Sequence, residues 1–132
     1  MNFLVDTHIL LWIVFSPKKI SKKTKTILLD PESTKFISII TFWEIALKFQ
    51  LGKIDLKDIF PDDLLTVSKN SGFEFLNLEF ETASTFYKLP LLKNKDPFDR
   101  MLAWQAICNN YILVTNDHEF ALYHNHGLKT VW

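Results

Sequence analysis

Short apolar segments alternate with helical patterns along this chain, and this order limits its fold more than any other feature. The segments that read as strands are Phe3–Val5, Phe36–Ile39, Phe73–Leu76, Ile112–Thr115 and Lys129–Val131. Most are continuous apolar runs, which is typical of strands that are buried on both faces. Strands separated by helices form parallel sheets with helices on both faces. We therefore expect an α/β fold with a mostly parallel central sheet of four to five strands flanked by helices.

Helix start and stop signals lie between these strands. Thr7 is expected to cap a helix over His8–Val14, and Ser21 to cap a second helix over Lys22–Leu29. A strongly apolar helix is expected from Thr41 to Leu51, ending at Gly52. The remaining expected helices are Asp62–Asn70, Thr82–Lys88, Asp96 to about Asn109, and His118–Tyr123.

Composition narrows the class of protein. The 132 residues fit one domain, 1–132, and the 48% hydrophobic content can fill its core. Fifteen basic residues balance fifteen acidic ones, so any nucleic acid must bind to local patches. The single cysteine, Cys108, excludes an intrachain disulfide framework and suits a reducing cytoplasm. Asp6 and His8 interrupt the apolar start of the chain, so we expect no targeting signal and no membrane segment.

Four carboxylates follow strands or begin helices. Asp6 and Asp117 follow the first and fourth strands, and Glu44 and Asp99 lie near the starts of two helices. Functional groups collect beyond the carboxyl ends of parallel strands, so these acids are expected to meet. Each also has an ordinary explanation. Asp6 and Asp117 could be N-caps, and Glu44 could complete a capping box with Thr41 or pair with Lys48.

The segment Asp96-Pro97-Phe98-Asp99 opens one of the helices. Asp96 suits the N-cap and Pro97 the first helical position. Asp99 lies on the same helix face as Ala103 and Ala106, which is the pattern of a face packed against a sheet. We therefore predict that Asp99 is the metal carboxylate and that Asp96 is mainly a cap and a secondary candidate ligand.

Like charges that gather in a partly buried site repel one another, and a divalent cation relieves the repulsion. Mg²⁺ or Mn²⁺ prefers oxygen ligands. Such a site favours hydrolysis by a metal-activated water. No other catalytic set competes, because the chain has no G-x-S-x-G, no H-E-x-x-H and too few glycines for a phosphate loop.

The chain resembles a PIN domain, close to the VapC-type toxin nucleases of bacterial toxin–antitoxin pairs. The stretches that carry the resemblance are LVDTHILLW at 4–12, TFWEIALKFQLGK at 41–53, DPFDRMLAWQA at 96–106 and LVTNDHEF at 113–120. They span almost the whole chain in the family's order. Relatives with a DPFDR stretch often carry a histidine just before it, where this chain has Lys93-Asn94-Lys95.

The resemblance implies a three-layer PIN-like fold and Mg²⁺- or Mn²⁺-dependent endoribonuclease activity. It implies that the site residues are Asp6, Glu44, Asp99 and Asp117, with Thr115 as a hydroxyl near the metal. It also implies a homodimer that is held inactive by a cognate antitoxin protein. Two alternatives stay open: a catalytically silent PIN-like module that binds a partner, and another Mg²⁺-dependent phosphoester hydrolase.

Basic side chains gather in two places. Lys18, Lys19, Lys22, Lys23 and Lys25 surround the second helix and read either as a solvated face or as an RNA backbone contact. Lys88, Lys93, Lys95 and Arg100 surround the proposed site, and Arg100, which follows Asp99, could steady a phosphate or pair with a carboxylate. His124 and His126 read as surface polar residues, since two histidines without a third ligand give no zinc site.

Overall fold

The computed structural model describes all residues from 1 to 132, with strands and helices in alternation. The strands are β1 (Asn2–Val5), β2 (Thr34–Ser38), β3 (Glu74–Leu76), β4 (Ile112–Val114) and β5 (Lys129–Val131). The α-helices are α1 (Thr7–Phe15), α2 (Lys22–Leu29), α3 (Ile39–Gln50), α4 (Pro61–Asn70), α5 (Phe80–Ser84) and α6 (Pro97–Asn109). Three 3₁₀ helices complete the chain: η1 (Pro17–Lys19), η2 (Phe86–Lys88) and η3 (His118–His126).

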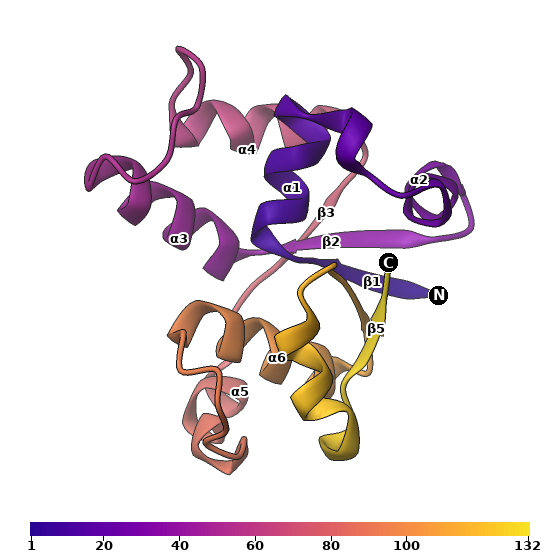
Figure 1. Ribbon diagram of the computed structural model, residues 1–132, viewed down its shortest axis with the longest axis vertical. Helices are drawn as coiled ribbons and strands as arrows, with labels where there is room; N and C mark the ends of the chain where they lie inside the picture. Colours follow the sequence, from indigo (N-terminus) through magenta and orange to yellow (C-terminus); the bar gives the residue numbers. More distant parts are fainter.

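All five strands are parallel and form one sheet in the order β3-β2-β1-β4-β5 (Figure 1). The predicted α/β fold is therefore confirmed. The chain moves outward from β1 to β2 and β3, and then returns to β4 on the other side of β1. Strands β1 and β4 thus flank the point at which the strand order reverses, and open α/β sheets form their ligand crevices at this point.

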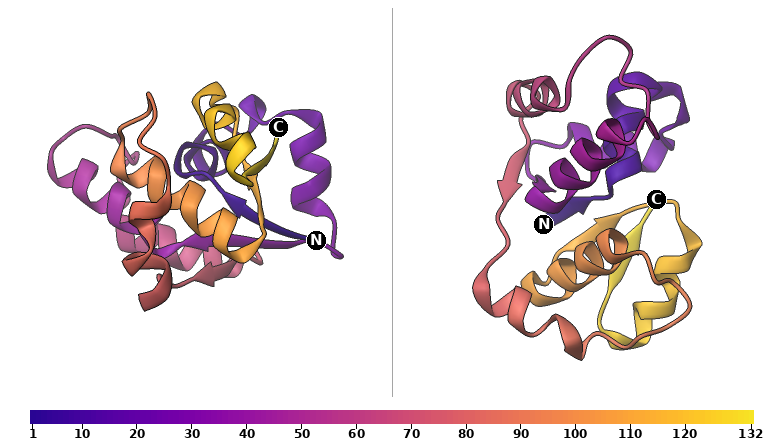
Figure 2. Two further views of the ribbon diagram at one scale, coloured as in Figure 1. Left: turned by 90° about the horizontal axis from the view of Figure 1, so that it is seen from below. Right: turned by 90° about the vertical axis from the view of Figure 1, so that its left-hand side faces the viewer.

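Side chains of β1 alternate between two cores on opposite faces of the sheet. Phe3 and Val5 pack into one core, and Leu4 packs into the other. Helices α1 to α4 contribute to the first core, while α6 and η3 contribute to the second. Figure 2 shows these helices as two groups on the two sides of the sheet. The predicted three-layer arrangement follows from this alternation.

Two predicted helix starts are wrong, and both errors concern the site. Helix α3 begins at Ile39, because the hydroxyl of Ser38 accepts a hydrogen bond from the Ile40 amide at 3.0 Å. The predicted capping box of Thr41 and Glu44 is therefore absent. The buried Thr41 hydroxyl instead bonds the hydroxyl of Thr7 at 3.1 Å. Thr7 is itself the first residue of α1 and does not cap it.

The other helix predictions agree more closely with the structure. Helix α2 begins after the Ser21 cap, as predicted. The carboxylate of Asp96 caps α6 by accepting from the amides of Phe98 at 2.8 Å and Asp99 at 3.2 Å. The single helix predicted over Thr82–Lys88 is instead two short helices, α5 and η2. None of the helices combines the length and apolar character needed to cross a membrane.

Candidate functional site

A cavity of about 290 Å³ opens at the carboxyl ends of β1 and β4, where the strand order reverses. The structure brings the four predicted carboxylates together there, along with Asp96 and two cationic side chains. The charged residues that line the cavity are Asp6, His8, Glu44, Lys48, Asp96, Asp99 and Asp117. Acids that are far apart in the sequence therefore share one small space.

Asp6 lies at the N-cap position of α1, but its carboxylate makes no capping hydrogen bond. The structure thus excludes the ordinary explanation for this residue. Instead, one carboxylate oxygen, Oδ2, accepts from the Thr115 hydroxyl at 2.8 Å and pairs with Nδ1 of His8 at 2.9 Å. Only 1% of Asp6 is exposed. This carboxylate is fixed in place from two sides.

His8 is a cation in this setting. Burial alone would lower its pKa, but the hydrogen bond and charge of Asp6 outweigh burial and raise the pKa to about 9. The other ring nitrogen, Nε2, bonds the side-chain oxygen of Asn116, just beyond β4. The imidazole therefore links the ends of β1 and β4 and supplies one positive charge to the cavity.

Glu44 points into the cavity from the second turn of α3 and is 4% exposed. Its Oε2 pairs with Lys48 one turn later, as the i,i+4 alternative predicted. Burial opposes the charge of Lys48, but the hydrogen bond and charge of Glu44 raise its pKa above the ordinary value. The second oxygen of Glu44, Oε1, is buried without a hydrogen-bond partner. A buried carboxylate oxygen without a partner is costly, so this part of the site is incomplete.

Asp99 lies on the first turn of α6. The helix face that it shares with Ala103 and Ala106 packs against the sheet as predicted, and both alanines are buried. Burial raises its pKa to about 7, and the charges of Asp96, Asp6 and Glu44 add to the effect. Asn94 opposes the shift by donating a hydrogen bond to its carboxylate at 3.3 Å. Asp99 thus exchanges its proton near neutral pH.

Replacing Asp99 with asparagine should stabilise the metal-free protein by about 2 kcal/mol at about pH 8, after allowance for the solvent exposure of the carboxylate. The pKa of Asp99 rises from 3.8 to about 7 on folding, so its ionisation opposes the folded state. The destabilisation by ionised Asp99 is absent below about pH 4, grows as the pH rises to about 7, and is complete above that. Urea unfolding in EDTA at several pH values measures the difference.

The exposed Asp62 of α4 does not line the cavity, so Asp62→Asn is the matched control for this measurement. It should change the free energy of unfolding by less than about 1 kcal/mol, the most that an exposed first-turn carboxylate gains from the helix dipole. If Asp99→Asn raises the free energy of unfolding equally at about pH 4 and about pH 8, the charge of Asp99 is not the source of the stabilisation.

Asp117 and Thr115 follow β4 and form a chain of contacts with Asp6. The Thr115 hydroxyl accepts from the Asp117 amide at 3.0 Å while it donates to Asp6. Asp117 also caps η3, since its Oδ1 accepts from the Glu119 amide at 2.9 Å. The capping explanation therefore holds for Asp117, but its carboxylate lines the cavity as well.

Arg100 lies outside the cavity lining. Its guanidinium donates to the carbonyls of Leu89 at 3.1 Å and Pro90 at 3.5 Å, and it stacks over the ring of Phe86. These contacts hold the segment before α6 rather than a carboxylate of the site. Asp96, the other secondary candidate, both caps α6 and lines the cavity.

The sequence reading missed three residues that position the acids: His8, Asn94 and Asn116. Asn94 is buried, and its side chain accepts from the Asp96 amide at 3.0 Å while it donates to Asp99. It lies in the stretch Lys93-Asn94-Lys95, directly before the cap of α6. The only sequence signal for these residues was their closeness to a candidate acid. Closeness in the sequence does not show which neighbours contact the acid.

The donor set suits a hard divalent cation, because it consists of carboxylate oxygens with too little positive charge around them. The unpartnered oxygen of Glu44 and the raised pKa of Asp99 both point to missing positive charge. However, no three His, Cys, Asp or Glu side chains lie in an arrangement that could hold a metal ion. His8 and Lys48 pair with two of the carboxylates instead. The residues fit a metal in kind, although they do not enclose one.

Comparison with known proteins gives one family and several similar structures. The family model for the PIN domain matches residues 3–124. A comparison with curated proteins gives no match. Among solved structures, VapBC2 from Rickettsia felis bound to a promoter DNA fragment has a chain with 21% identity and a TM-score of 0.71, covering 99% of this chain and 98% of that one.

Two further structures are similar over the same length. DNA-bound VapBC from Salmonella typhimurium has a chain with 20% identity and a TM-score of 0.64, and VapBC-1 from nontypeable Haemophilus influenzae has one with 17% identity and a TM-score of 0.66. Each match covers 99% of this chain and 97% of the other. At these identities the likeness concerns the fold.

Proposed function

Since this chain belongs to the PIN domain family, we propose that it is an endoribonuclease that depends on Mg²⁺ or Mn²⁺. The observation that carries the proposal is the cavity at the carboxyl ends of β1 and β4, where five carboxylates meet only two cations. A phosphodiester would be repelled by such a site unless further positive charge were present. A metal-dependent reaction on a phosphate resolves this conflict.

Asp6, Glu44, Asp99 and Asp117 are the residues that would hold the metal. The chemistry that Mg²⁺ or Mn²⁺ supplies in such a site is a more acidic bound water and neutralisation of charge on the phosphate. The other residues of the site hold these carboxylates in position. Thr115 and His8 fix the carboxylate of Asp6, while Asn94 and the cap of α6 fix that of Asp99. Deprotonation of Asp99 above about pH 7 would favour metal binding.

The proposal is tested by comparing substrates with Mn²⁺ present. We expect internal cleavage of single-stranded RNA and no hydrolysis of p-nitrophenyl phosphate, because a polymer brings binding energy that a small ester lacks. Gel analysis of end-labelled RNA and the absorbance of nitrophenolate measure the two reactions. Hydrolysis of the small ester alone would favour the alternative phosphoester hydrolase. No reaction and no Mn²⁺ binding would favour the silent partner-binding module.

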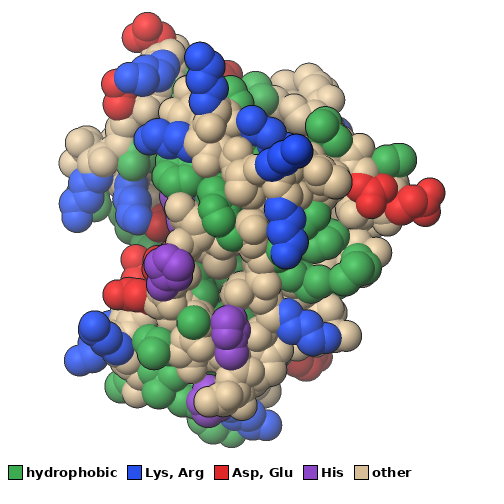
Figure 3. Space-filling view, turned by 45° about the vertical axis from the view of Figure 1, so that its right-hand side comes forward, with side chains coloured by type: hydrophobic (Ala, Val, Ile, Leu, Met, Phe, Trp, Pro, Cys, Tyr) green, Lys and Arg blue, Asp and Glu red, His purple; other side chains and the backbone are tan.

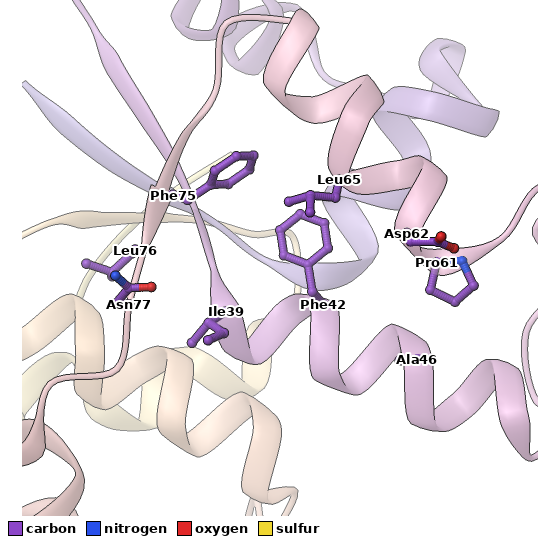
Figure 4. Close-up of a pocket in the computed structure, with 9 residues that line it drawn as sticks. All are labelled: Ile39, Phe42, Ala46, Pro61, Asp62, Leu65, Phe75, Leu76 and Asn77. Atoms are coloured by element: carbon purple, nitrogen blue, oxygen red, sulfur yellow. The ribbon is translucent and has the colours of Figure 1, made fainter.

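A toxin of a toxin–antitoxin pair is the biological role that we propose for this nuclease. All three similar structures described above are VapBC assemblies. An apolar groove of about 600 Å³ between α3, α4 and the edge strand β3 offers a surface for a cognate antitoxin. Figure 4 shows Phe42 and Leu65 beside each other in this groove, with Phe75 on the neighbouring strand. An amphipathic antitoxin segment is suited to such a surface.

Leu65→Lys should prevent the product of a neighbouring gene from binding the chain and from inhibiting RNA cleavage, because it places a charge in the groove. Co-purification and inhibition of cleavage measure the effect. Leu29→Lys, at an exposed position on α2, is the matched control. Equal loss of binding in both variants would argue against the groove. The homodimer that the resemblance implies is tested by light scattering of the same samples.

A further inference from the structure

A second, polar groove of about 390 Å³ adjoins the acidic cavity, and Asp117 lines both. It runs between α2, η3 and the end of β5. Its lining also includes Thr115, whose hydroxyl bonds Asp6, and Asn116, whose side chain bonds His8. The groove therefore begins at the contacts that fix the site carboxylates.

The groove carries an unpaired lysine and two histidines that keep ring nitrogens free for hydrogen bonds. Lys23 lines it from α2, and its ammonium takes part in none of the molecule's salt bridges. His118 makes no side-chain hydrogen bond, and His124 engages only Nε2, with the Thr130 hydroxyl at 2.9 Å. Figure 3 shows lysine and histidine side chains spread over one face of the molecule. These groups are available to a phosphate.

An indole forms one wall of the groove. Trp132 packs edge-on against Trp12 with ring centroids 5.9 Å apart, and Trp12 packs edge-on against His8 at 5.2 Å. Lys19 lies over the Trp12 ring at 5.2 Å. This aromatic row holds the half-buried Trp132 in place. A fixed aromatic ring beside an unpaired lysine and hydrogen-bonding side chains is a combination by which proteins bind single-stranded nucleic acid.

We propose that this groove binds the RNA nucleotide next to the phosphodiester that is cut. Lys23 and the two histidines contact its phosphate, and Trp132 stacks on its base. The inference rests on the proposed nuclease function. The chain has no net charge and its cleavage cavity is acidic, so RNA needs local positive charge close to that cavity. Lys23 in the groove supplies such a charge beside the acidic cavity, and the volume of the groove suits a ligand the size of a nucleotide.

The test is binding of a fluorescein-labelled single-stranded RNA, followed by fluorescence anisotropy in Ca²⁺, which supplies positive charge to the acidic cavity, with gels to check that the RNA stays intact. Lys23→Ala should weaken binding severalfold and lower the log–log salt slope by about 0.7, the value for one phosphate contact with a single strand. Trp132→Leu should weaken binding about tenfold through loss of stacking. Lys25→Ala is the matched control, since Lys25 lies on the same helix but lines a different, apolar cavity.

Trp132 also packs against the core, so circular dichroism and thermal unfolding must show that Trp132→Leu is folded. Trp132→Phe, which keeps an aromatic ring, should restore most of the affinity. Equal weakening by Lys25→Ala and Lys23→Ala would overturn the proposal, because it would show a diffuse charge effect. Wild-type affinity in both Lys23→Ala and a folded Trp132→Leu would also overturn it.

Cleavage in Mn²⁺ separates failure of the groove from failure of the nuclease function. If the wild type cuts RNA and both groove variants cut it with an unchanged KM, the groove is wrong and the nuclease function stands. If the wild type neither binds nor cuts RNA, both proposals fail. A raised KM in Lys23→Ala and in folded Trp132→Leu, with Lys25→Ala unchanged, supports the groove.

Discussion

Asp6→Asn should lower the rate of RNA cleavage by about a thousandfold, which corresponds to about 4 kcal/mol of lost transition-state stabilisation. Asp6 is the acid that the structure ties most firmly to the cavity. It has no capping role, it is almost fully buried, and both Thr115 and His8 contact its Oδ2. Asparagine keeps the shape and an acceptor for Thr115 but removes the charge. Single-turnover cleavage of labelled RNA in Mn²⁺ measures the loss.

The matched control for Asp6→Asn is Asp62→Asn, which removes an exposed charge of α4. Its cleavage rate should equal that of the wild type. The fold of Asp6→Asn should persist, because Leu4 and Val5 on either face of β1 keep their core contacts. Circular dichroism checks this. A folded Asp6→Asn protein that retains more than about a tenth of the wild-type rate would be inconsistent with a metal site at this carboxylate.

Chelation of divalent ions should abolish cleavage, and added Mn²⁺ should restore it. The reason is the charge of the cavity, where five carboxylates face His8 and Lys48 alone. Metal binding should also raise the midpoint of thermal unfolding, since a ligand that binds only the folded state stabilises it. The rise should be larger at about pH 8 than at about pH 6, because Asp99 has a pKa of about 7 and binds metal in its ionised form.

Two measurements check this second prediction: RNA cleavage with EDTA and with graded Mn²⁺, and thermal unfolding under the same conditions. Asp99→Asn serves as the comparison, because it should lose most of the metal-dependent stabilisation and its dependence on pH. Cleavage that persists in EDTA would exclude a metal-dependent mechanism. Mn²⁺ that leaves the unfolding midpoint unchanged at both pH values would exclude binding at these carboxylates.

An N-cap position does not by itself decide whether an acid caps its helix. Asp6, Asp96 and Asp117 all stand where an N-cap is expected, but Asp6 caps nothing, and the other two cap a helix and also line the cavity. Local sequence cannot tell these cases apart, because the choice depends on Thr115 and His8, one of which lies over a hundred residues from Asp6. The Thr41 capping box failed because Ser38 begins α3 one turn earlier.

The alternation of strands and helices by itself determined the parallel sheet. Its central strands β1 and β4 are continuous apolar runs that are buried, while the edge strands β3 and β5 are more exposed. The sequence also predicted that the acids at strand ends and helix starts meet. In open α/β sheets, functional groups gather beyond the carboxyl ends of the strands. The pair of Lys48 with Glu44 was also predictable, because it joins neighbouring turns of one helix. Only the tertiary structure decided that Thr115 bonds Asp6 and that Arg100 bonds the carbonyls before α6 rather than a carboxylate. These contacts depend on burial and on side-chain distances between elements, which the order of residues does not contain.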